Sequence, residues 1–580
     1  MTDLTPNSQE PVNPDIGFVS GGGLEANLQV RLTVPAQEVQ SGAFVVMDSG
    51  YWRFYGLVTD LQLGAVDLQY ANQLNINRFN PELANLLNQQ TLFTNLSVMS
   101  ALMLERGPEP GTDEHTAWLE KRNYQMPKLM PSKTIPNHHT KVRLADIGDI
   151  QDIFGKESKT VFRIGETREQ GHPVCLDLEK FVQRSSGIFG ATGSGKSFLA
   201  RMILAGLVHA DTASTLIFDM HNEYGIDSTD PQKGTSVPGL KGKFSSKVKL
   251  VALGRNTTLK GKNPDFTLEI AYSDITPEDI LLLSQALNLT DTTSATLDAL
   301  YSDFGKNWFR TFMEMKTGAG STFTNDDGKQ EAREDSVAFW AKAANINEIA
   351  ATTLHSKLRR LYNRDYLVNE TGTDVLKSLI DHLENKQHVV LSFGKYESDL
   401  DYLLVTNLIT RKIRDAWEKA TDRFHSKVQN ASEPQPLVIV VEEAHKLLNP
   451  EMASQTIFSI IARELRKYYV TLLIIDQRPS QIYDEVMSQL GTRISASLGD
   501  EDDINAVLSG QASRAALRGM LAKLQPSEEV LMTGWSVKMP IVIRSRRYDQ
   551  TFWSDLFGVS ETKEEKLTLD QLNREMGFFE

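Results

Sequence analysis

Residues 185–210 read SSGIFGATGSGKSFLARMILAGLVHA, and this stretch decides the fold. It contains the pattern G-x-x-x-x-G-K-S, with Gly190, Gly195, Lys196 and Ser197 at the fixed positions. A short apolar run precedes the pattern and a helix-periodic run follows it. A strand, a glycine-rich loop and a helix in this order predict a phosphate-binding loop, whose backbone N–H groups surround the phosphates of a nucleotide. The alternative is a chance match in a glycine-bearing loop, and the flanking strand and helix disfavour it.

We expect this loop to hold ATP. In a loop of this kind the ammonium of Lys196 neutralises the β- and γ-phosphates, and the hydroxyl of Ser197 binds Mg²⁺. The residues expected to contact the nucleotide are Gly190, Ala191, Thr192, Gly193, Ser194, Gly195, Lys196, Ser197 and Phe198.

The bulk properties of the chain exclude several classes of protein. Its 580 residues are enough for two to four domains. No apolar run is long enough to span a membrane, and the polar start lacks the features of a signal peptide. Cys175 is the only cysteine, which excludes an intrachain disulfide. These features favour a cytoplasmic protein. The net charge of −14 argues against a wholly basic surface for nucleic acid but permits a locally basic channel.

Strand and helix patterns change along the chain. Short alternating strands from Ile16 to about Gly64 predict a small antiparallel barrel, with closing strands from the run Val142–Phe162. Beyond it, strands alternate with helices, which predicts an α/β fold with a parallel sheet. Residues 317–335 interrupt a helical block and read as an exposed loop.

These patterns predict six segments in chain order. They are a disordered leader (1–15), the barrel (16–165), a first part of the ATPase core (166–274), a helical insertion (275–385), a second part of the core (386–540) and a C-terminal extension (541–580).

A second acidic motif follows a strand in the second part of the core. The run LVIVV at 437–441 is followed by Glu442 and Glu443. Ligands of open α/β sheets bind at the carboxyl ends of strands, where these acids lie. Because adjacent residues of a strand point to opposite sides, Glu442 is expected to bind Mg²⁺ and Glu443 to activate the attacking water. A solvated acidic strand end is the alternative.

Other polar residues follow neighbouring strands. Gln477 comes directly after the strand 469–475, where it either contacts the γ-phosphate or the water, or is a plain loop residue. Asp219 ends the strand in the run STLIFDM at 214–220 and is a further expected contact of the nucleotide. His221 and Glu223 follow this strand, and a metal trio of the three residues has no further support.

Three arginines are candidates for contacting the γ-phosphate of a neighbouring subunit. Arg184 precedes the strand before the loop, and Arg463 and Arg466 lie on the helix after the acid pair. An ordinary solvated helix face is the alternative for the last two.

The motifs GATGSGKS, FDMHNEYG, LVIVVEEAHKLL, ARELRKYYV and IDQRPSQI occur in an order that resembles the HerA family of the HerA–FtsK superfamily. The resemblance covers the barrel, which is similar to a HAS-barrel, and the ATPase core, which it implies is RecA-like. One departure is the segment ELRKYYV, where the family often has a glycine in a segment of the type GRKYG.

The resemblance implies roles and partners. Lys196 and Ser197 match the Walker A residues, Glu442 and Glu443 the Walker B acids, and Asp219 the acid after the second core strand. Arg184 matches a basic residue that contacts the nucleotide of a neighbouring subunit. Arg466 lies near the arginine finger of the family, with Arg463 as a competitor. The family forms homo-hexameric rings that thread double-stranded DNA, and its partners include the NurA nuclease and Sir2-like or other defence effectors.

The sequence therefore predicts an ATP-driven translocase or helicase on double-stranded DNA in end resection or antiviral defence. An ATP-switched ring scaffold that regulates an effector is the alternative, and a small-molecule kinase is disfavoured. The lysines at 241, 243, 247 and 249 either line the pore or belong to a solvated edge, which is the favoured interpretation.

Overall fold

The structure is a computed structural model that describes most of the chain. The described residues are 13–24, 26–65, 92–108, 111–123, 127–229, 234, 236–255, 257, 259, 261–290, 292–324, 330–371, 374–451, 457–511 and 514–558. Most of the predicted leader and the end of the predicted C-terminal extension lie outside these residues. The chain forms two compact units, of which the first is Met1–Phe181, Phe189–Leu199 and Gly491–Arg547, and the second is Val182–Ile188, Ala200–Leu490 and Tyr548–Glu580.

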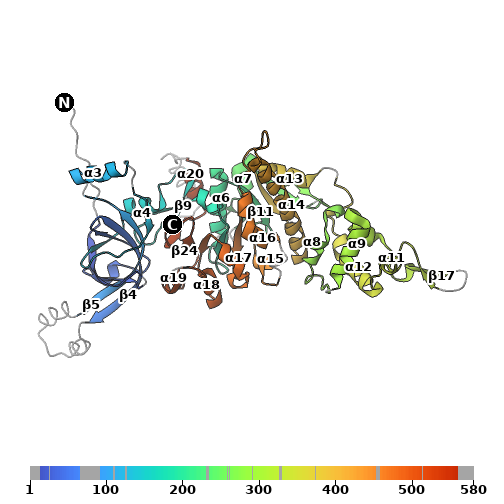
Figure 1. Ribbon diagram of the computed structural model, residues 1–580, viewed down its shortest axis with the longest axis horizontal. Coiled ribbons are helices and arrows are strands. Elements are labelled where there is room, and N and C mark those ends of the chain that lie inside the picture. The colour runs from blue at the N-terminus through green and yellow to red at the C-terminus, as the bar shows by residue number, and fades with distance from the viewer. Residues whose placement is uncertain are drawn as a thin grey trace, which may run out of the picture. The chain divides into compact units, whose positions relative to one another are not determined.

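The first unit contains an antiparallel barrel, as predicted (Figure 1). Its strands are β1 (Asp15–Gly21), β2 (Leu28–Leu32), β3 (Phe44–Ser49), β4 (Trp52–Ala65), β5 (Leu92–Glu105), β6 (Met130–Pro131) and β7 (Lys141–Leu144). Strand β7 pairs with β1 and β3, and β2 pairs with β5, so the sheet closes on itself. Its valine-rich centre is fully buried, with Val30, Val45, Val58 and Val98 at 0% exposure.

One expectation for the barrel is wrong in part. Of the run Val142–Phe162, predicted to give closing strands, only β7 closes the barrel, because Ile147–Phe154 forms helix α4. A capping box explains the helix: the Asp146 carboxylate accepts from the Asp149 N–H, and the Asp149 carboxylate accepts from the Asp146 N–H.

The first unit also contains an antiparallel ladder in the order β23 (Thr492–Ser495), β24 (Glu529–Gly534), β25 (Ile541–Ser545), β8 (Val161–Thr167) and β9 (Pro173–Asp177). The sequence predicted a parallel sheet for the ATPase core, and this antiparallel ladder was not predicted. Short hairpins join β24 to β25 and β8 to β9, and a hairpin connects antiparallel neighbours, whereas parallel neighbours need a long crossover. The domain limits drawn from the sequence stay predictions.

The second unit contains the predicted parallel sheet. Its strands are β15 (Phe266–Leu268), β14 (Val248–Leu253), β20 (His388–Ser392), β11 (Ser214–Asp219), β21 (Leu437–Glu442), β22 (Val470–Asp476) and β10 (Ser186–Phe189), in this order across the sheet. The pairings from β15 to β22 are all parallel. Strands β11, β21 and β22 are buried along their whole length, which is typical of a sheet covered on both faces.

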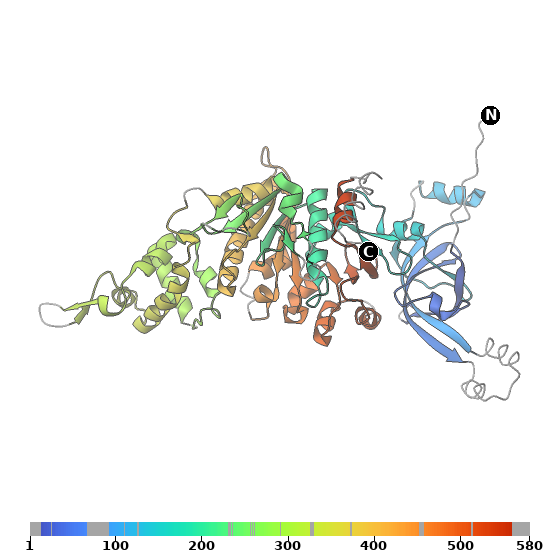
Figure 2. The ribbon, with the colours of Figure 1, turned by 180° about the vertical axis from the view of Figure 1, so that it is seen from behind.

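Helices pack against this sheet. Among them are α6 (Lys196–Ala210), α13 (Val375–Glu384), α14 (Asp399–His425) and α16 (Ile457–Glu464). Helix α13 contacts β20 and β11, and α16 contacts β22. Figure 2 shows the same elements from behind. None of the helices in the described ranges has the length and apolar character needed to cross a bilayer.

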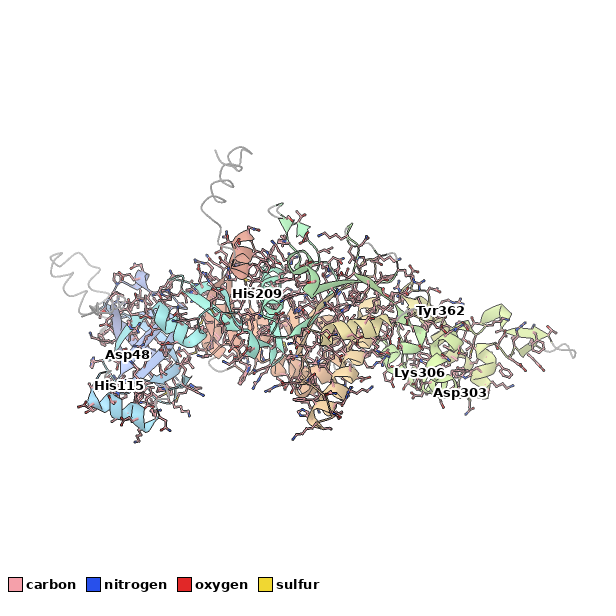
Figure 3. The ribbon with its side chains drawn as sticks, turned by 90° about the horizontal axis from the view of Figure 1, so that it is seen from above. Asp48, His115, His209, Asp303, Lys306 and Tyr362 are labelled. Carbon is pink, nitrogen blue, oxygen red and sulfur yellow. The ribbon has the colours of Figure 1, made fainter. Side chains whose placement is uncertain are left out.

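The helices predicted between 275 and 385 are present as α8 (Pro277–Leu281), α9 (Thr293–Phe304), α10 (Trp308–Glu314), α11 (Val337–Ala343), α12 (Glu348–Tyr362) and α13. Buried aromatic residues join them, and the Trp340 indole donates to Asp303, which Figure 3 labels together with Lys306 and Tyr362. The predicted loop 317–335 contains a short hairpin of β17 (Thr322–Thr324) and β18 (Gln330–Ala332).

Candidate nucleotide-binding site

The glycine-rich loop has the backbone of a phosphate-binding loop. It follows β10, and Lys196 is the first residue of α6. Gly193 and Gly195 have φ values of +78° and +84°, a region that favours glycine. The Ser194 N–H donates to the Ala191 carbonyl across 3.2 Å, so the loop folds back on itself. The N–H groups at the start of α6 complete a site suited to an anion.

Close packing explains another of the motif glycines. A Cβ on Gly190 would lie 2.4 Å from the Ser194 hydroxyl and 3.0 Å from the Ala496 Cβ. The Ala191 N–H donates to the Ser497 carbonyl at 2.9 Å, which fixes the start of the loop on the segment after β23. The other predicted nucleotide contacts, from Thr192 to Phe198, follow on the same continuous stretch of chain.

The first of the two acids is held in the sheet. Glu442 is the last residue of β21 and is 7% exposed. The Tyr224 hydroxyl donates to its Oε1 at 2.6 Å, and the Tyr402 hydroxyl donates to its backbone carbonyl at 2.9 Å. Burial and the nearby Glu442 raise the pKa of both tyrosines well above their ordinary value. Both therefore stay neutral donors that orient Glu442.

The second acid lies outside the strand. The prediction that Glu442 and Glu443 diverge because they alternate on one strand is wrong in its reason. β21 ends at Glu442, and Glu443 has φ = +46°, where the chain turns into α15 (His445–Leu448). A left-handed backbone at a non-glycine residue is strained and persists only where its surroundings hold it.

Two side chains supply those surroundings. The Gln477 Nε2 lies 3.2 and 3.4 Å from the two carboxylate oxygens of Glu443, so the residue after β22 faces the acid. Contact of Gln477 with the γ-phosphate or the attacking water stays a prediction. The His445 Nδ1 lies 3.5 Å from the Glu443 Oε2. Glu443 therefore has a fixed orientation and is still partly open to solvent.

His445 is a residue that the sequence reasoning missed. Its backbone N–H donates to the Asp476 Oδ2 at 2.7 Å, and its Nδ1 lies 3.0 Å from the same oxygen. Asp476 is fully buried at the end of β22. The hydrogen bond to Asp476, together with the charges of Asp476 and Glu443, outweighs burial and raises the pKa of His445. The signal in the sequence was a histidine two residues after the acid pair and an aspartate ending the next strand.

Asp219 shapes a loop. Its carboxylate accepts from the N–H groups of Glu223, Tyr224 and Gly225 at 2.7, 3.0 and 3.1 Å. Burial raises the pKa of Asp219, and these bonds offset part of the rise. The loop carries Tyr224 to Glu442, so Asp219 positions the acid indirectly. Direct contact of Asp219 with the nucleotide stays a prediction. Within the described ranges, no group of three or more His, Cys, Asp or Glu side chains is placed to hold a metal.

The three candidate arginines differ in setting. Arg184 is partly buried just before β10, and Arg466 is exposed on the turn Leu465–Tyr468. Arg463 lies on α16, and its side chain is outside the described part of the structure. A role across a subunit interface stays a prediction for all three.

The departure from the family at ELRKYYV falls on a strained residue. Tyr469 has φ = +64°, so a tyrosine adopts the left-handed backbone that a glycine would adopt without strain. Its carbonyl accepts from the Leu437 N–H at 2.9 Å, which links the start of β22 to the start of β21.

The lysine cluster is anchored locally. Lys241 and Lys247 form ion pairs of 2.8 Å with Asp265 and Asp211, and Lys243 lies over the ring of Trp553. These contacts favour the interpretation as a charged edge.

A glycine-rich loop that opens a helix, together with a parallel sheet that carries paired acids at the carboxyl end of a strand, defines a P-loop ATPase with a RecA-like core. Residues 162–413 match the family described as "Helicase HerA, central domain". The central region of the chain is therefore similar to the central domain of the HerA helicase family.

The relatives extend the similarity beyond the central domain. The chain is 22% identical to the DNA double-strand break repair helicase HerA of Saccharolobus solfataricus over 535 residues, 91% of each chain. It is 24% identical to that of Sulfolobus acidocaldarius over 543 residues, 92% of this chain and 93% of the other. Among solved structures, it is similar to the bacterial conjugative coupling protein TrwB at 12% identity and a TM-score of 0.44, over 70% of this chain and 92% of that one.

Proposed function

We propose that this chain is an ATP-driven translocase or helicase on double-stranded DNA that works as a homo-hexameric ring. The relatives named as DNA double-strand break repair helicases support the DNA substrate, because they align with more than nine-tenths of the chain. The observation that carries the proposal is the setting of Glu443, which Gln477 holds through both carboxylate oxygens at 3.2 and 3.4 Å.

In this proposal the loop 190–197 binds the phosphates of ATP. Lys196 neutralises charge on the β- and γ-phosphates, and Ser197 and Glu442 hold Mg²⁺. A hydroxyl and a carboxylate are hard oxygen donors of the kind that Mg²⁺ takes, so the residues present fit the ion. When bound, the ion neutralises charge on the phosphate oxygens.

Glu443 is the general base. It orients a water molecule and removes its proton as the water attacks the γ-phosphorus, while the bond from the γ-phosphorus to the β–γ bridging oxygen breaks and ADP leaves. Gln477 and His445 keep the carboxylate in one direction, so the base is oriented before the substrate binds. Arg184, Arg466 and Arg463 are the candidates for a cation that reaches the γ-phosphate from the next subunit.

The biological partner is part of the proposal. The HerA resemblance points to a nuclease, either NurA-like in DNA end resection or a Sir2-like or other effector in antiviral defence. An ATP-driven motor at the centre of such a complex would feed duplex to the nuclease.

The test is steady-state ATP hydrolysis with and without linear duplex DNA. We expect duplex to stimulate turnover, and the stimulation to fall steeply as salt rises, since contacts to the DNA backbone release counterions. Turnover that ignores DNA at every salt concentration would contradict the proposal. With an effector bound, DNA cleavage at full rate by Glu443→Gln would favour the scaffold alternative.

A further inference from the structure

A second loop of the first unit contacts the phosphate-binding loop. The Ser527 hydroxyl donates to the Gly193 carbonyl at 2.6 Å. The Ser527 backbone also comes so close that a Cβ on Gly195 would lie 3.3 Å from the Ser527 Cα. No motif in the sequence marks Ser527, which lies more than 300 residues from the loop it contacts.

This contact holds one peptide plane of the phosphate-binding loop at both ends. The carbonyl of Gly193 and the N–H of Ser194 belong to the same planar, trans peptide group. Ser527 binds the carbonyl, and the Ala191 carbonyl accepts from the N–H at 3.2 Å. Holding this plane keeps the loop in its phosphate-binding shape, so less ordering is needed when ATP binds.

Ser527 is itself held under strain. Its φ is +65°, an unfavourable region for a residue with a side chain. The turn around it is closed by the Gln525 N–H, which donates to the Glu529 carboxylate at 2.9 Å, and by the Glu529 N–H, which donates to the Gln525 carbonyl at 3.1 Å. The Glu529 carboxylate therefore stabilises the turn that carries Ser527.

The same carboxylate binds an arginine that reaches the barrel. Arg168 contacts both carboxylate oxygens of Glu529, with its Nε at 2.6 Å from Oε1. Its Nη1 donates to the Ser41 carbonyl at 2.9 Å, between the short helix at 36–38 and β3. Glu529 is 2% exposed, so water competes little with this ion pair.

We propose that Ser527 is a positioning residue for the phosphate-binding loop, and that the Arg168–Glu529 ion pair lets the state of the barrel at Ser41 set the affinity for ATP. The inference rests on the proposed function, because it assigns regulation to the same ATP site. A partner that moves the segment around Ser41 shifts Arg168 and so changes the ion pair with Glu529. The turn that carries Ser527 then moves, and this changes the shape of the phosphate-binding loop at Gly193.

The first experiment uses Ser527→Gly, because glycine accepts the left-handed backbone and removes only the hydroxyl. We expect Kd and KM for ATP to rise about three- to tenfold, as for loss of one hydrogen bond, with kcat unchanged. Ser321→Gly is the matched control, because it removes a hydroxyl that donates to the Gly318 carbonyl at 2.7 Å in the helical insertion. Equal ATP affinity in the two variants would overturn the positioning role.

The second experiment measures hydrogen–deuterium exchange of the peptide that covers 190–197, without nucleotide. We expect Arg168→Gln to speed exchange there at least threefold and to weaken ATP binding, with partial recovery in Arg168→Lys. Arg53→Gln is the matched control, since Arg53 of β4 also binds two carboxylates, those of Asp48 on β3 and Asp149 on α4.

Unchanged exchange and unchanged ATP affinity in Arg168→Gln would overturn the path to the barrel. If Arg168→Gln does not fold, Glu529→Gln, which keeps the shape of the side chain, takes its place with the same expectations. The exchange experiment needs no nucleotide, so it tests the connection from Arg168 to the phosphate-binding loop even if the wild-type protein does not hydrolyse ATP. A wild-type protein that does not hydrolyse ATP would contradict the proposed function and not this connection.

Discussion

The phosphate-binding loop and the acidic end of β21 reach their shapes by different means. In the loop, left-handed positions are occupied by Gly193 and Gly195, at φ +78° and +84°, so the local sequence permits the turn. At the strand end, Glu443 has φ +46° with a full side chain. Gln477 and His445 hold its carboxylate, and His445 depends on Asp476 from another strand.

This difference shows where a sequence motif is enough to predict the local backbone conformation. A glycine adopts a left-handed backbone without help from its surroundings, so the shape of a glycine-rich loop can be predicted from consecutive residues. A strained acid keeps its conformation only through partners that the fold brings together. Variants of each region should therefore fail in different ways.

The largest effect is expected from Glu443→Gln. Removing the general base should lower kcat by about 10²- to 10⁴-fold, while Kd for ATP stays within about threefold, because the phosphates bind elsewhere. Phosphate release and calorimetry measure the two quantities. Glu464→Gln, an exposed acid on α16, is the control and should leave both unchanged. If Glu443→Gln lost ATP affinity by as large a factor as kcat, the assignment of ATP binding to the loop and of catalysis to the strand end would be contradicted.

Gly195→Ala tests the loop. At φ +84°, with the Ser527 Cα 3.3 Å from the added methyl, the loop must shift or accept strain. A cost of about 2 kcal/mol corresponds to roughly thirtyfold weaker ATP binding. Calorimetry should show the lost affinity with little change in the temperature of unfolding. Wild-type affinity would show that the left-handed backbone at this position is not required.

The sheet that carries the acids should weaken in acid because of His388. This residue begins β20, is 1% exposed and lies 3.0 Å from the Thr215 hydroxyl through its Nδ1. Burial lowers its pKa to about 4. The unfolded chain takes up the proton near pKa 6.5, so the stabilising contribution is complete above that pH and is lost as pH falls toward 4.

Between pH 7.5 and 5 this linkage amounts to about 2 kcal/mol of the free energy of unfolding. Urea unfolding at the two pH values measures it. His388→Gln, which does not titrate, should lose about that much of the pH dependence, and an unchanged pH dependence in this variant would contradict the assignment.

His445→Ala should lower kcat about tenfold, the effect of losing one hydrogen bond to a charged group, with Kd for ATP unchanged. His445→Asn keeps a donor for Asp476 and should recover part of the rate. A split between kcat and KM separates this role from a general loss of folding. A wild-type kcat in His445→Ala would contradict a role for His445 in orienting Glu443 and would leave that role to Gln477.

The smallest effect concerns Tyr469. Both Tyr469→Gly and Tyr469→Ala lose the ring, but only glycine relaxes the φ of +64°. The glycine variant should therefore be more stable than the alanine variant by about 1 kcal/mol. Thermal unfolding of the pair measures the difference, and equal stability would show that this backbone carries no strain.

Much of the fold was readable because it follows from periodicity. The strands ending at Phe189, Asp219, Glu442 and Asp476 are apolar runs within one or two residues of the predicted limits. The antiparallel ladder of β23, β24, β25, β8 and β9 was not readable, because it joins segments more than 300 residues apart.

The sequence indicated some residues of the candidate site and not others. Lys196 and Ser197 follow from the motif, and Gln477 from its place after a strand. His445 and Ser527 were missed because their importance lies in contacts with Asp476 and Gly193, which consecutive sequence does not reveal. The sequence marks the segment ELRKYYV as a departure from the family, and the structure shows that Tyr469 within it has a left-handed backbone.

We propose that Glu443 activates the water that hydrolyses ATP, and that this hydrolysis moves the protein along duplex DNA. The most direct measurement is displacement of a strand or roadblock from linear duplex by the assembled protein with ATP and Mg²⁺, compared between wild type and Glu443→Gln. The account predicts displacement by wild type alone, with both proteins binding ATP. Equal displacement by the two proteins, or none by wild type while it hydrolyses ATP, would contradict it.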